Sequence, residues 1–164
     1  MSIIVSDKQE NLIKVSMRYV SKGHNGVVIF NDEGEEREWI ESHAVAIANK
    51  KLEYNIDEIP KSLMKSPSEK IEELNTFWKR MDWGTQNKIL KESRVPDSDD
   101  IDYMIYQFSL MKYLMTDWDF MDKKGNKVPL DERIFEKMDY KVASHLISRY
   151  EKELNSEDEL ANFV

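Results

Sequence analysis

The spacing of hydrophobic residues changes along the chain from a strand-like pattern to a helical one. Residues 12–20 and 27–30 read as strands, and the loop 21–26 between them is rich in residues that tolerate positive φ. This pattern predicts a β-hairpin. Residues 31–34 form a second turn signal, after which residues 37–40 are expected to add a short third strand. Three short strands are only marginally stable alone, so we expect the sheet to pack on helices.

Helical signals begin at residue 66. Ser66 as N-cap, Pro67 at the first helical position and Glu69 at the third suggest a capping box. A helix is therefore predicted from Ser66 to about Met81. Residues 44–48, just before it, could form a short helix. The apolar residues that recur at helical spacing after the cap are Ile71, Leu74, Phe77, Trp78 and Met81.

Four more helices are expected after residue 84. The predicted spans are 86–93, from the acidic run 97–100 to about 116, 131–138, and a last helix capped by Asp139. A hairpin-like connector should occupy residues 118–130, because the sequence there contains a tight-turn signal and a proline. The last helix carries an apolar stripe made of Val142, Leu146, Tyr150 and Leu154.

The elements together predict an α+β fold that is mainly α. A small N-terminal β-hairpin or three-stranded sheet would be followed by a bundle of about five helices. We expect a β-rich region over residues 1–65, a helical domain over 66–154, and an acidic, frayed tail over 155–164.

Composition narrows the class of partner. The chain has 164 residues, 40% of them hydrophobic, and a net charge of -8, which repels a phosphate backbone and argues against nucleic-acid binding. There are no cysteines, so disulfides and thiolate metal sites are excluded. We expect no export signal and no membrane association, and the chain is predicted to be cytoplasmic.

No residue pattern predicts an enzyme, a cofactor or a metal site. The nucleophile motif GxSxG is missing, and 5 glycines do not form a phosphate-binding loop. The acidic run 97–100 superficially suggests calcium, but it lacks the glycine and distal glutamate of an EF-hand, so a helix start is favoured. The three histidines have no metal-ligand spacing; they are His24, His43 and His145.

Methionine and aromatic residues mark a candidate partner-binding surface. Met104, Phe108, Met111 and Met115 share one helical face. Such a face usually packs in a core, but methionine also adapts to apolar partner helices. The partner-binding candidates are Trp83, Met104, Phe108, Met111 and Tyr150.

Two segments of the second half resemble the tail assembly chaperones of long-tailed bacteriophages. Residues 77–87, FWKRMDWGTQN, look like that family's basic and hydrophobic "TWG"-like segment. Residues 118–130, WDFMDKKGNKVPL, are similar to its connector before the last helices, although Asp117 stands where the family often has glycine. The resemblance covers roughly residues 72–154, and residues 1–66 match nothing in the family.

The resemblance implies a non-enzymatic role. A chaperone of this family would bind the tape measure protein in the host cytoplasm, keep it soluble and assist tail assembly, through an apolar helical face. Two alternatives stay open, namely a structural or connector subunit of a phage particle and an acidic inhibitor that mimics DNA. A homo-oligomer also remains open.

Overall fold

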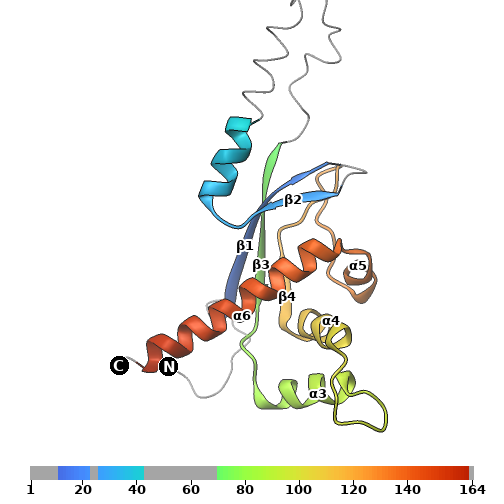
Figure 1. Ribbon diagram of the computed structural model, residues 1–164. Helices are drawn as coiled ribbons and strands as arrows, with labels where there is room; N and C mark the ends of the chain where they lie inside the picture. Colours follow the sequence, from blue (N-terminus) through green and yellow to red (C-terminus); the bar gives the residue numbers. More distant parts are fainter. Residues whose placement is uncertain (1–10, 23–25, 43–69, 163–164) are drawn as a thin grey trace, which may run out of the picture. The chain divides into compact units, whose positions relative to one another are not determined.

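The computed structural model describes residues 11–22, 26–42 and 70–162, with side chains described through residue 155. The fold is α+β, and its sheet has the strand order β2-β1-β3-β4. The labelled elements, in chain order, are β1 (Ile13–Ser21), β2 (Val27–Phe30), β3 (Ile71–Trp78), α3 (Trp83–Ser93), α4 (Tyr103–Leu114), β4 (Met115–Trp118), α5 (Glu132–Lys137) and α6 (Tyr140–Asn162) (Figure 1).

The chain divides into two compact units. The first contains residues 1–16 and 74–164, and the second contains residues 17–73. The division falls within β1 and β3, so each unit holds part of both strands. The predicted capping box at residues 66–69 and the short helix at 44–48 lie outside the described residues.

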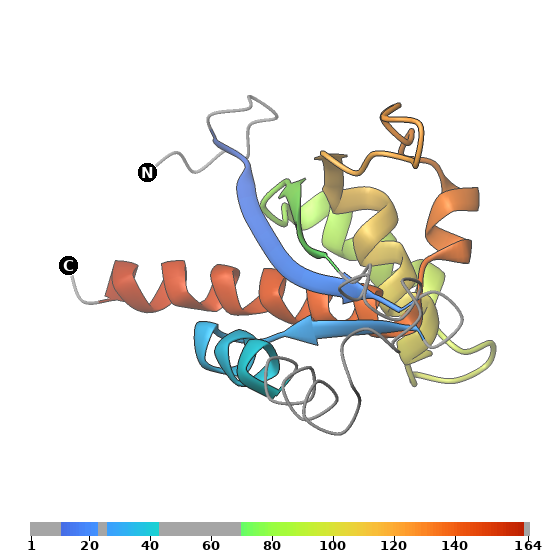
Figure 2. The same ribbon diagram turned by 90° about the horizontal axis from the view of Figure 1, so that it is seen from above.

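The predicted β-hairpin is confirmed in the second unit, but the predicted third strand is wrong. β1 and β2 pair antiparallel, with Arg18 opposite Phe30. Residues 33–42 then form a helix that follows β2 directly (Figure 2). On this helix Trp39 packs edge-on against Phe30, with ring centroids 5.8 Å apart, and Glu36 accepts two hydrogen bonds of 2.8 Å from the Arg18 guanidinium. That bonding lowers the pKa of Glu36.

Local capping explains the helix over residues 33–42. Asp32 accepts a hydrogen bond of 2.8 Å from the backbone N–H of Glu35. Glu35 in turn accepts from the backbone N–H and the side-chain amide of Asn31, at 2.8 and 3.0 Å. This reciprocal arrangement closely resembles a capping box, and it satisfies donors that a helix start leaves open.

The helix predicted over residues 66–81 is also wrong where the structure describes it, because residues 71–78 form β3. The buried positions in this strand are Leu74, Thr76 and Trp78, which alternate with more exposed neighbours. Alternation of this kind places every second side chain on the same face of a sheet. Thr76 is the one polar residue of this buried row, and its hydroxyl donates a hydrogen bond of 2.8 Å to the backbone oxygen of Val15.

The first unit holds the four labelled helices and much of the core. α6 packs against the end of β3, where Tyr150 stacks on Trp78 with ring centroids 4.6 Å apart (Figure 1). The Tyr150 hydroxyl donates a hydrogen bond of 2.6 Å to the backbone oxygen of Lys79. Leu146, one turn earlier on α6, is also buried, so the predicted stripe on the last helix includes two fully buried residues.

The connector and the last two helices lie close to their predicted places. α5 begins after Asp131, whose carboxylate accepts from the backbone N–H of Ile134 at 2.9 Å. In the connector, Met121 pairs with Lys127 across a turn in which Gly125 has a φ of 81°. The backbone of α6 is helical through Asn162, well into the predicted tail (Figure 2).

A first prediction concerns the start of α3. The Thr85 N–H donates to Asp82 at 2.7 Å, and hydrogen bonding from Thr85 holds the pKa of the Asp82 carboxyl below its usual range. A carboxyl with a lowered pKa stabilises the fold above about pH 4, and that contribution is lost as the pH falls further. Asp82→Ala should therefore cost about 1 kcal/mol of unfolding free energy at neutral pH.

Urea denaturation followed by circular dichroism measures this cap. Asp82→Asn is the matched control, because asparagine keeps a capping oxygen but does not titrate. The asparagine variant should remain close to wild type at neutral pH and lose less stability below about pH 4. An alanine variant as stable as wild type at neutral pH would show that the cap contributes nothing.

Candidate protein-binding surface

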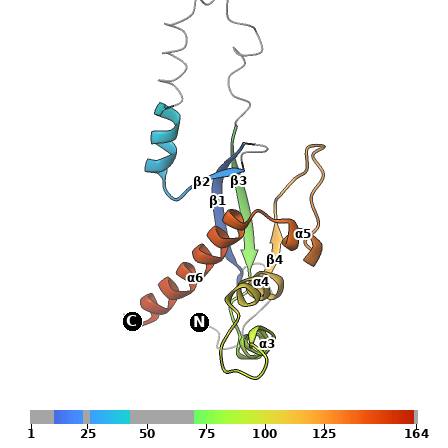
Figure 3. The same ribbon diagram turned by 45° about the vertical axis from the view of Figure 1, so that its right-hand side comes forward.

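The α3–α4 helix hairpin lies at one end of the first unit. Its two helices lie side by side (Figure 3). α4 begins after Asp102, whose carboxylate accepts from the backbone N–H groups of Met104 and Ile105 at 3.0 and 3.2 Å. The cap of α4 is therefore Asp102, and the predicted cap within residues 97–100 is wrong by a few residues.

Backbone hydrogen bonds close the loop that joins the two helices. The N–H of Val95 donates to the oxygen of Asp100 at 2.9 Å, and the N–H of Asp102 donates to the oxygen of Ser93 at 2.7 Å. At the tip, Asp97 has a φ of 58°, a left-handed conformation that aspartate tolerates better than most residues. The loop is thus a short two-stranded turn that fixes the end of α3 to the start of α4.

Large apolar side chains are exposed where this loop enters α4. Tyr103 and Met104, in the first turn of the helix, are 59% and 61% exposed. Three aliphatic side chains in the loop and the first turn of α4 are also exposed, with the acidic side chains of Asp99, Asp100 and Asp102 among them in the sequence. We call the five exposed apolar residues the apolar corner. The apolar corner consists of Val95, Ile101, Tyr103, Met104 and Ile105.

The solvent side of α3 has a different character. Ile89 is buried against the unit, and helical geometry turns residues four and seven positions apart to the same side. We call the exposed set opposite Ile89 the outer face of α3. It consists of Trp83, Asn87, Leu90, Lys91 and Arg94.

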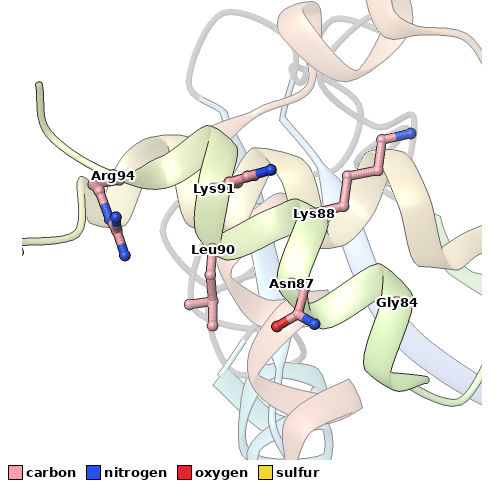
Figure 4. Close-up of a pocket in the computed structure, with 6 residues that line it drawn as sticks. All are labelled: Gly84, Asn87, Lys88, Leu90, Lys91 and Arg94. Atoms are coloured by element: carbon pink, nitrogen blue, oxygen red, sulfur yellow. The ribbon is translucent and has the colours of Figure 1, made fainter.

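An open pocket runs along α3 and overlaps this outer face. Four of its lining residues belong to the outer face, and Gly84 and Lys88 complete it. Figure 4 shows Asn87 and Leu90 projecting from one side of the helix and Lys88 from the other. The lining contains three cationic side chains and no acidic one, in a chain whose net charge is -8.

The cations near α3 differ in their surroundings. The Lys88 ammonium lies 4.5 Å from the centre of the Tyr113 ring, and Tyr113 donates a short hydrogen bond to Glu92. Lys112 pairs with Glu132 at 3.1 Å, a contact that raises the Lys112 pKa. These groups tie α3, α4 and α5 together. Lys88 and Glu92 are exposed on the side of α3 next to Tyr113 of α4, and not on the outer face.

The five predicted partner-binding residues separate into two groups. Trp83, at the first position of α3, is 81% exposed, and Met104 lies in the apolar corner. Phe108 is half-buried, whereas Met111 and Tyr150 are buried in the core. Only Trp83 and Met104 are therefore available to a partner on this surface.

Several surface residues were missed at the sequence level. The apolar pattern of α4 extends around most of the helix, so it did not show which side would remain exposed. Lys91 and Arg94 belong to no motif that marks them in the sequence. A signal was nevertheless present. Lys91 and Arg94 are three positions apart, and Leu90 is four positions before Arg94, so the three side chains share one side of a helix.

Metal and membrane features were also sought in the structure. Within the described ranges, no three histidine, cysteine or carboxylate side chains gather where they could hold a metal ion. No described helix is both long enough and apolar enough to cross a lipid bilayer.

Comparison with known proteins gives no relative for this chain. No protein-family model, no curated protein and no solved structure matches it.

Proposed function

We propose that this protein binds an apolar segment of another protein through the α3–α4 hairpin, as a non-enzymatic tail assembly chaperone of a long-tailed phage. The proposed partner is the tape measure protein, a long protein prone to form coiled coils. Its apolar stripe would rest on the apolar corner while the acidic exterior of this protein keeps the complex soluble.

The exposure of the apolar corner is the observation that carries this proposal. Tyr103 and Met104 are well exposed, exposed Ile105 follows them directly, and exposed Ile101 precedes them by two positions, beyond Asp102. Clustered apolar exposure of this kind marks binding sites in soluble proteins. Methionine is suited to such a site because its flexible thioether adapts to irregular partners. The phage assignment rests on the resemblance of residues 77–87 and 118–130.

Charge introduced at the apolar corner tests the proposal. Tyr103→Asp and Met104→Asp should each reduce co-purification with a tape-measure-like fragment by roughly tenfold or more, because a buried carboxylate opposes apolar docking. Both positions lie in the first turn of α4, where an acidic side chain agrees with the helix dipole. We therefore expect circular dichroism and thermal melting of both variants to remain close to wild type.

The matched control is Tyr140→Asp. Tyr140 is 63% exposed and, like Tyr103, begins a helix directly after an aspartate cap, but it lies on α6. This variant should retain the fragment. If Tyr103→Asp and Tyr140→Asp retain equal amounts, the apolar corner does not bind the fragment. If the protein is found in mature particles, the alternative role of a structural subunit is favoured.

A further inference from the structure

The outer face of α3 combines positive charge with apolar side chains. Among the described residues, no carboxylate forms a salt bridge with Lys91 or Arg94. Leu90 and Trp83 lie on the same face, and the Asn87 amide lies between them along the helix. The face therefore offers two cations, one amide and two apolar contacts to solvent.

The charge of the rest of the chain makes this face distinctive. With 32 acidic against 24 basic residues, the protein as a whole repels acidic partners. The outer face of α3 carries two cations, Lys91 and Arg94, and no carboxylate, which is a local reversal of sign. Opposite charge across an interface fixes the register of a partner and disfavours partners of the wrong sign.

We propose that the outer face of α3 docks an acidic amphipathic helix of a partner protein. Carboxylates of that helix would pair with Lys91 and Arg94, and its apolar stripe would contact Leu90 and Trp83. This inference rests on the proposed function, and it adds the chemistry of the segment that the hairpin receives. The outer face and the apolar corner adjoin where Arg94 pairs with Ile101.

A protein helix fits this face better than a nucleic acid does. A nucleic-acid surface usually carries a larger excess of basic residues, because phosphates are spaced closely along the strand. Here Glu92 lies on the same helix, and an aliphatic side chain, Leu90, lines the pocket between Lys88 and Lys91. Aliphatic contacts are typical of helix-in-groove recognition.

Fluorescence anisotropy with two labelled synthetic helical peptides tests the inference on the full-length protein. Both peptides carry the same leucine stripe, and their polar faces carry either glutamate or glutamine. The glutamate peptide should bind more tightly, and added salt should weaken it more. The double variant Lys91→Glu/Arg94→Glu should weaken its binding by roughly tenfold or more, because two attractions become repulsions.

The matched control is Lys123→Glu/Lys124→Glu, which makes the same change in net charge on the exposed connector turn. This control should alter glutamate-peptide binding only slightly. Equal weakening by the two double variants would overturn the inference, since net charge alone would then explain the effect. The inference would also be overturned if labelled single-stranded DNA bound more tightly than the glutamate peptide and lost that binding in Lys91→Glu/Arg94→Glu.

Failure of this inference can be told apart from failure of the proposed function. If the glutamine peptide binds as tightly as the glutamate peptide, and Met104→Asp abolishes both, the apolar corner is a binding site without acidic preference. If the glutamate peptide depends on Lys91 and Arg94 while Met104→Asp has no effect, the outer face stands and the apolar corner does not. Absence of binding by both peptides would overturn the inference.

Discussion

Replacing Trp118 by alanine should lower the free energy of unfolding by about 3–5 kcal/mol. The Trp118 side chain is only 4% exposed, and its ring lies 5.3 Å from that of Phe120. Its indole N–H donates a hydrogen bond of 2.7 Å to the backbone oxygen of Val128. The substitution would therefore remove a large buried ring and the bond that ties both ends of the connector together.

Urea denaturation of three variants separates these contributions. Trp118→Phe keeps an aromatic ring but loses the N–H, so it should cost less than the alanine variant. Trp83→Ala removes the same atoms at a position that is 81% exposed and should change stability by no more than about 0.5 kcal/mol. If the unfolding free energy of Trp118→Ala is within about 0.5 kcal/mol of wild type, Trp118 does not anchor the connector.

Thr76→Val is expected to cost about 2–4 kcal/mol although it barely changes side-chain volume. The buried Thr76 hydroxyl donates to the backbone oxygen of Val15 at 2.8 Å and accepts from the Trp78 indole N–H at 2.7 Å. Valine can make neither bond. The Trp78 indole N–H and the backbone oxygen of Val15 would therefore both lose the Thr76 hydroxyl as a partner inside the core. Buried polar groups without partners are costly because water cannot reach them.

Thr76→Ser is the decisive comparison. Serine keeps the hydroxyl and loses a methyl group, so its cost should be about 1 kcal/mol. If both hydrogen bonds matter, the valine variant will be clearly less stable than the serine variant in chemical denaturation. A serine variant that is the less stable of the two would mean that packing of the methyl group dominates at this position.

Some turns and caps were predicted correctly, but the period of two segments was not. The hairpin between Val20 and Val27 and the cap at Asp139 follow from short-range chemistry, and the structure contains both. β3 was predicted as a helix because only apolar residues were counted. When Thr76 is included, the buried row has the two-residue period of a strand.

The helix over residues 33–42 was missed. Asp32 and Glu35 have the spacing of a helix cap, but the turn signal over residues 31–34 favoured a third strand over residues 37–40. A strand would turn every second side chain after residue 34 to the same side, whereas a helix would turn every third or fourth. A short segment does not contain enough positions to decide between these periods.

Two of the predicted partner-binding residues lie on the surface that we propose as a binding site. Trp83 and Met104 were found because aromatic residues and methionine are favoured at binding sites, and both are exposed. Met111 and Tyr150 have the same chemistry but are buried. Their burial depends on contacts distant in sequence, such as the stacking of Tyr150 on Trp78, and no local pattern reveals those contacts.

The closed loop between α3 and α4 has a consequence for the thermodynamics of association. Its backbone bonds, from Val95 to Asp100 and from Asp102 to Ser93, would hold the proposed binding surface in one backbone conformation in the free protein. A surface that is preorganised loses little conformational entropy on binding. The partner helix would then bear most of the ordering cost, and differences in affinity among partners should appear mainly in their dissociation rates.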